Sequence, residues 1–110
     1  MRGYKVVRRG MNGWESCAIA RPGGGVTYRV KRTTRRPKNG GPLCVFSSKK
    51  SALRMANDFL FFEPLRVFSC EYVPSLDRNI WTPGKPEVSV YWLYPSTHLA
   101  DSVKLIERVK

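Results

Sequence analysis

The chain has 110 residues, with 20 Lys+Arg, 8 Asp+Glu and one His, and a formal net charge of +12. A chain this short rarely holds two separate cores, so we expect a single domain over residues 1–110. Hydrophobic residues make up 42% of it and aromatic residues 12%, which excludes a disordered basic tail. No apolar run approaches the roughly 18 residues of a membrane-spanning helix, and no signal peptide is recognisable. We therefore expect a cytoplasmic protein that does not bind membranes.

The charge is divided unevenly along the chain. Residues 1–54 carry 14 Lys+Arg and one acid, a net +13, whereas residues 55–110 carry 6 Lys+Arg and 7 acids, a net −1. A surface that serves solubility alone usually mixes both signs. This division predicts one strongly positive face, whose partners are polyanions: DNA, RNA or an acidic protein surface.

Most of the chain is predicted to form strands. Alternating or wholly apolar segments separated by Gly and Pro indicate strands. In chain order these segments are 4–9, 14–20, 26–32, 43–46, 66–73, 88–94 and 102–109. An Asn-Gly pair within 10–13 predicts a tight hairpin turn after the first strand. Residues 26–32 alternate most clearly, with Val26, Tyr28 and Val30 on one face.

The hydrophobic period changes once, after residue 48. Apolar residues from Ala52 to Leu60 recur at helical spacing, Ser47 and Ser48 can cap the first turn, and Pro64 ends the pattern, which predicts a helix of roughly 13 residues. Residues 35–42 are basic and rich in Gly and Pro and predict an exposed loop, whereas 74–87, with three prolines and a glycine, predict a long ordered loop whose residues 80–81 pack against the body of the domain. The expected fold is α+β: a mostly antiparallel curved sheet of about five to seven strands packed on one main helix.

The core is expected to lie between that helix and the two apolar strands that flank it in sequence. The residues assigned to this one cluster are Phe46, Leu53, Phe59, Phe68 and Tyr72. Cys17, Cys44 and Cys70 form no C-x-x-C pair, and each lies in an apolar segment, so we expect reduced thiols packed as small hydrophobic residues. With one histidine, His98, the sequence predicts no metal site and no cofactor.

Several segments together resemble a known family. They are residues 4–8 (YKVVR), 28–30 (YRV), 36–38 (RPK), 41–48 (GPLCVFSS), Ala52, 70–75 (CEYVPS) and 99–106 (LADSVKLI). The pattern is similar to that of a family of small uncharacterised proteins from phages, other viruses and bacteria. The resemblance implies a compact domain of viral origin, acting in the host cytoplasm, and implies no particular mechanism.

The segment Arg29–Lys38 carries the strongest functional signal. Six cations lie within these ten residues, and Gly40 and Gly41 follow. Arginine offers forked donors that suit phosphate oxygens, and neutralised phosphates release counterions. The residues expected to bind nucleic acid are Arg8, Arg9, Arg29, Lys31, Arg32, Arg35, Arg36, Lys38, Lys49 and Lys50. The alternative is an edge strand whose charges prevent aggregation.

Other functions are open at this point. The protein could be an inhibitor or accessory protein that docks on an acidic protein partner, such as a host defence component. Alternatively, Arg8, Ser47 or Ser48, and Glu71 follow the order of an ADP-ribosyltransferase site, in which Glu orients the acceptor. A cap at Ser47–Ser48 and a solvent-facing Glu71 explain the same residues without catalysis, and we expect no catalytic residues. Gly23–Gly25 lacks the Lys and Ser or Thr of a phosphate loop and predicts a turn, and the sequence gives no oligomeric state.

Overall fold

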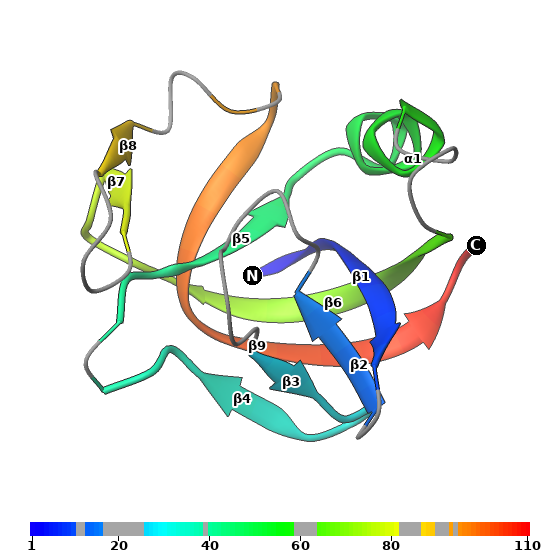
Figure 1. The fold of residues 1–110 in the computed structure, drawn as a ribbon, viewed down its shortest axis with the longest axis horizontal. Helices are drawn as coiled ribbons and strands as arrows, with labels where there is room; N and C mark the ends of the chain where they lie inside the picture. Colours follow the sequence, from blue (N-terminus) through cyan, green and yellow to red (C-terminus); the bar gives the residue numbers. More distant parts are fainter. Residues whose placement is uncertain are drawn as a thin grey trace.

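Antiparallel strands make up most of the structure (Figure 1). The computed structural model describes residues 1–10, 13–16, 26–38, 40–58, 64–81, 87–89, 93 and 95–110. The main sheet has seven strands: β1 (Arg2–Gly10), β2 (Gly13–Ser16), β3 (Thr27–Tyr28), β4 (Thr33–Arg35), β5 (Leu43–Phe46), β6 (Leu65–Pro74) and β9 (Thr97–Arg108). A small second sheet pairs β7 (Asn79–Ile80) with β8 (Val88–Ser89), and the helix is α1 (Lys49–Asp58).

The main sheet closes on itself. One edge of β1 pairs with β6, from Arg2 opposite Glu71 to Arg8 opposite Leu65, and β6 pairs in turn with β9. β5 lies between β1 and β9 and pairs with both, so β1, β5, β9 and β6 form a closed ring. β2 and β3 extend β1, while β4 extends β9. The α+β prediction holds in its coarse form, but the curved sheet is a small barrel.

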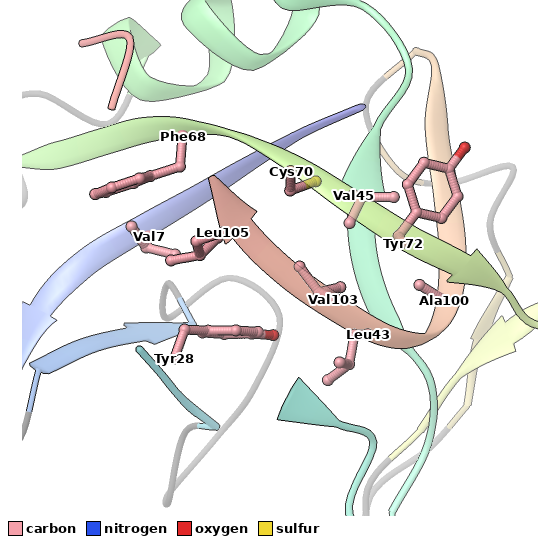
Figure 2. Packing of buried hydrophobic residues seen from close by; sticks show 10 residues of the cluster. All are labelled: Val7, Tyr28, Leu43, Val45, Phe68, Cys70, Tyr72, Ala100, Val103 and Leu105. Carbon is pink, nitrogen blue, oxygen red and sulfur yellow. The ribbon is translucent and has the colours of Figure 1, made fainter. Parts of the chain in front are cut away.

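The barrel interior contains the larger core cluster (Figure 2). Side chains alternate across a strand, and β6 accordingly directs Phe68, Cys70 and Tyr72 inward, as predicted. The other members of this cluster are Val7, Tyr28, Leu43, Val45, Ala100, Val103 and Leu105. Burial of these side chains is the main source of the free energy that holds the barrel closed.

The helix forms a second cluster on the outside of the barrel. Ala52, Met55 and Ala56 are its buried residues, and they pack with Val6, Phe46, Leu65 and Val67. The Oγ of Ser48 accepts a hydrogen bond from the N–H of Ser51 at 3.3 Å, which confirms the predicted cap. The continuation of the helix beyond Asp58 was also predicted, but residues 59–63 lie outside the described part of the chain.

The prediction of one common core cluster is wrong. Phe68 and Tyr72 lie inside the barrel, whereas Phe46 and Leu53 belong to the cluster beneath α1. The strand β6 contributes to both, because Leu65 and Val67 face the helix while alternate residues face the interior. Phe59, the fifth expected member, is not among the described residues.

The strand predicted at residues 26–32 is also wrong in most of its length. Only Thr27–Tyr28 forms a strand, and the chain then turns so that it can enter β4. Lys31 has a φ of 66°, and its N–H donates to the carbonyl of Leu105 at 2.7 Å. Val30 is consequently 40% exposed instead of sharing the buried face of Tyr28. Local alternation cannot reveal a turn that is fixed by a distant strand.

The loop predicted to be exposed at residues 35–42 is partly buried. Arg35 ends β4, and residues 40–42 are buried. Gly41 packs directly on the backbone of Trp81, where a Cβ would collide, and its N–H donates to the Trp81 carbonyl at 3.0 Å. A glycine is therefore required at this close approach.

The remaining predicted strands have mixed outcomes. The segments 43–46, 66–73 and 102–109 correspond to β5, β6 and most of β9. β2 occupies the start of 14–20 and β8 the start of 88–94. Residues 17–25, which include Cys17 and Gly23–Gly25, are outside the described residues, as are 90–92 and 94.

Candidate nucleic-acid interface

The outer face of β4, β9, β6 and β1 is hollowed. These strands are successive neighbours by pairing (Figure 1). A hollow of about 590 Å³, which we call the large hollow, lies over their outward side chains. Its polar lining comes from Arg2, Thr33, Arg35, Glu71, Asp101, Ser102 and Lys104. Three cations, two hydroxyl groups and two carboxylates from four strands therefore surround one concave surface.

Strand register brings the charges of this hollow into a row. Glu71 on β6 is opposite Arg2 on β1 and also opposite Lys104 on β9, and Lys104 is opposite Thr33 on β4. Neighbouring strands are about 4.8 Å apart, so the backbones of Arg2 and Lys104 lie on either side of Glu71 at about that spacing. The row thus presents positive, negative and positive groups in succession, followed by a hydroxyl.

The turn between β3 and β4 adds further cations beside the large hollow. Arg29, Lys31 and Arg32 are all exposed, and the turn leads directly into Thr33, which lines the hollow. None of these three cations, nor Arg35, forms an ion pair with another described residue. We call Arg2, Arg29, Lys31, Arg32, Arg35 and Lys104 together the basic face.

Arg36 has a different role from its neighbours. Its Nε and Nη2 donate to the Gly40 carbonyl at 3.4 and 3.2 Å, and its Nη1 donates to Ser75 Oγ at 3.3 Å and Asp101 Oδ1 at 3.1 Å. Nη2 is also 2.9 Å from Asp77 Oδ2. These contacts use all five guanidinium N–H groups. Burial acts to lower the pKa of Arg36, but the hydrogen bonds and charges of Asp101 and Asp77 outweigh it and raise the pKa.

The other predicted binding residues are dispersed. Arg8 is ion-paired with Glu15, with 3.5 Å between Nε and Oε1, and the guanidinium of Arg9 lies 5.3 Å from the centre of the Trp14 ring. Lys38 is exposed in the loop after β4 and lines neither hollow. Lys49 and Lys50 are exposed in the first turn of α1, which lies away from β4 in Figure 1. The ten predicted residues are therefore not one site.

A second hollow adjoins the first. It measures about 250 Å³ and is lined by Arg2, Gly3, Tyr4, Ser47, Ser69, Cys70, Glu71 and Ile106. We call it the small hollow. Arg2 and Glu71 line both hollows, so the two adjoin at these side chains. Ser47, two residues before Lys49, lines the small hollow only.

Sequence reasoning missed Arg2 and Lys104 as members of the site. Lys104 alternates with the inward-facing Val103 and Leu105, which marks it as an outward residue, and that signal was present in the sequence. What was absent was the register, which alone places Lys104 beside Thr33 and Glu71. Register between strands distant in sequence depends on the closed barrel.

The residues considered for catalysis do not meet. Glu71 is opposite Arg2 on β1, which is six residues from Arg8, or about 20 Å at the usual rise of a strand. Ser47 lines the small hollow with Glu71, but Ser48 is the residue that caps the helix. The order Arg, Ser, Glu thus does not correspond to one transferase-like cleft.

The thiol of Cys70 is not activated. Burial raises the pKa of the Cys70 thiol to about 11, so this thiol is protonated at neutral pH. Cys70 is buried in the core, as predicted, whereas Cys44 is only half-buried; neither forms a disulfide bond with another described residue. His98 is exposed. Among the residues that the structure describes, no three His, Cys, Asp or Glu side chains come together as a metal site.

The comparisons with known proteins add no relative to this picture. No protein-family model, no curated protein and no solved structure matches the chain. The resemblance to small phage proteins therefore stays a prediction. Within the described ranges, no helix is long and apolar enough to cross a bilayer.

Proposed function

We propose that this protein binds nucleic acid without catalysing a reaction, and that the basic face is the surface it uses. The observation that carries the proposal is the group of exposed cations on the β3–β4 turn and β4, which have no ion-pair partner among the described residues. Two other described arginines are neutralised: Arg8 by Glu15, and Arg36 by Asp77 and Asp101. Three cations of the basic face line the large hollow, and the turn that carries the other three leads into it.

Phosphate groups are the ligands that fit this arrangement. Arginine presents planar forked donors to phosphate oxygens, and hydroxyl groups such as those of Thr33 and Ser102 can donate as well. Each phosphate that is neutralised releases a condensed counterion, which makes the affinity dependent on salt. A formal net charge of +12 also favours rapid association with a polyanion.

The experiment replaces three cations of the basic face at once. In the variant Arg29→Ala, Arg32→Ala, Arg35→Ala, the affinity for a fluorescein-labelled oligonucleotide is measured by anisotropy from about 50 to 200 mM salt. Three lost phosphate contacts are expected to flatten the slope of log affinity against log salt by about 2 and to weaken binding more than tenfold at low salt. Lys31 is kept, because alanine would be strained at its φ of 66°.

The matched control removes the same charge elsewhere. Arg54, Arg78 and Lys110 are exposed cations that line neither hollow. Their triple alanine variant should keep most of the salt slope. Equal loss in both variants would mean that net charge alone governs binding. If neither the parent nor the variants bind oligonucleotides, an acidic protein becomes the better partner and the proposal fails.

A further inference from the structure

We propose that the large and small hollows form one path for a single strand of nucleic acid, in which Glu71 recognises the amino group of a base and Tyr4 stacks on a base. This inference rests on the proposed function and deepens it by naming the class of nucleic acid. It begins from a feature that phosphate binding does not explain. A carboxylate stands in the middle of the basic face, between Arg2 and Lys104.

Glu71 is placed to contact a base, while its cationic neighbours are placed to contact phosphates. Its side chain is exposed, lines both hollows and forms no ion pair with another described residue. A carboxylate repels phosphate, but it accepts hydrogen bonds from exocyclic amino groups such as N4 of cytosine. Arg2 and Lys104 on either side can hold the phosphates that flank such a base.

The shape of the site favours an unpaired strand. The base edges of a duplex lie inside its grooves, where a protruding helix or ribbon must reach them. Here Glu71 lines a depression, not a projection. The depression consists of the large hollow of about 590 Å³ and the small hollow of about 250 Å³. An unstacked base can enter the depression and present its edge to the carboxylate, as single-stranded ligands do on other sheet surfaces.

Tyr4 provides an aromatic surface at the next position along the path. It is on β1 opposite Ser69, two residues from Arg2, and lines the small hollow while packing partly against the cluster under α1. It is half-buried, so part of the residue remains accessible. A ring in this position can stack on any base, which gives affinity without strong sequence preference.

The first measurement compares labelled oligonucleotides of about 12 nucleotides, a length within the range of site sizes known for small barrels. Oligo-dC and oligo-dA carry exocyclic amino groups, whereas oligo-dT carries none. Wild-type protein is expected to bind oligo-dC about fivefold or more tightly than oligo-dT, and more tightly than a duplex of equal length. A duplex that binds as well as oligo-dC overturns the proposal.

The variant Glu71→Ala tests the carboxylate itself. It should bring the dC to dT affinity ratio close to one, and it should raise the affinity for oligo-dT because the repulsion of phosphate is lost. Glu107→Ala is the matched control: Glu107 is an exposed carboxylate of β9 that lines neither hollow. This control should preserve the ratio. An unchanged ratio in Glu71→Ala overturns the assignment of Glu71.

A pair of substitutions tests Tyr4. Tyr4→Phe keeps the ring and should bind like the parent, whereas Tyr4→Leu should bind all oligonucleotides about fivefold or more weakly. Thermal unfolding of both variants shows whether the leucine variant is folded. If a folded Tyr4→Leu protein binds like the parent, the stacking role is wrong.

Two further outcomes are distinguishable. One is a site for a free nucleotide instead of a strand, and the other is a failure of this inference that leaves the proposed function standing. If cytidine monophosphate binds as tightly as the oligonucleotide, the hollow is a site for a free nucleotide and the strand path is overturned. The other outcome is a salt-dependent affinity that the basic-face variant reduces, but with no preference among bases and with equal binding of a duplex. That result would overturn this inference and leave the proposed function intact.

Discussion

The barrel interior and the turn between β3 and β4 both contain cations, with opposite consequences. Inside the barrel, Lys5 is 4% exposed, its Nζ donates to the Cys44 carbonyl at 2.5 Å, and it lies 5.2 Å from the centre of the Tyr28 ring. On the turn, Arg29 and Arg32 are exposed and have no ion-pair partner among the described residues. A buried cation must have its donors satisfied by the fold, whereas an exposed one stays available to a ligand.

Arg36 shows that this distinction does not follow the sequence. It adjoins Arg35, yet its guanidinium joins the loop after β4 to Asp77 and Asp101. Arg35 lines the large hollow instead. Adjacent arginines on a strand end face opposite ways, so one contributes to stability and the other to the surface. The formal charge of a segment therefore overstates what is available for binding.

The largest effect is expected inside the barrel. Lys5→Ala removes the buried stem and the hydrogen bond from Nζ to the Cys44 carbonyl, which should lower the free energy of unfolding by about 2–4 kcal/mol. Lys5→Met keeps the volume without the charge and should cost less than about 1.5 kcal/mol. Urea denaturation measures both. Equal losses would mean that the contacts of the ammonium group, not its packing, hold β1 in place.

The next effect concerns Arg36. Arg36→Ala leaves Asp77, Asp101 and the Gly40 carbonyl without this partner, and a loss of about 1–3 kcal/mol in the free energy of unfolding is expected. The control Arg35→Ala should stay within about 0.5 kcal/mol of the parent. If Arg35→Ala loses more free energy of unfolding than Arg36→Ala, the roles assigned to the two arginines are wrong, because Arg35 would then be the structural residue.

The smallest effect separates stability from binding. Lys31→Gly relieves a left-handed backbone at φ 66° and should raise the free energy of unfolding by about 0.5–1 kcal/mol. The same substitution removes one cation from the basic face, so the salt slope should fall by about 0.7–0.9. Arg29→Gly removes an equal charge where no positive φ occurs, and it should lower stability. A Lys31→Gly protein that is less stable would contradict the observed turn.

Much of the local structure follows from short-range patterns in the sequence. Apolar segments placed β5, β6 and β9, the Ser48 cap placed the start of α1, and alternation assigned Phe68, Cys70 and Tyr72 to one face. The charge division also predicted a positive surface, and part of the segment Arg29–Lys38 lies beside the large hollow. These features depend on the spacing of hydrophobic residues along a strand or helix and on the chemistry of the helix cap, both of which act over a few residues.

Which distant residues meet depends on the closure of the barrel. Closure of the barrel separated Phe46 from Phe68, turned residues 29–32 away from the expected strand, and withdrew Arg36 from the basic surface. The same closure placed Arg2 and Lys104 beside Glu71. Register across strands that are distant in sequence is set by the packing of the whole interior, so no local pattern carries it.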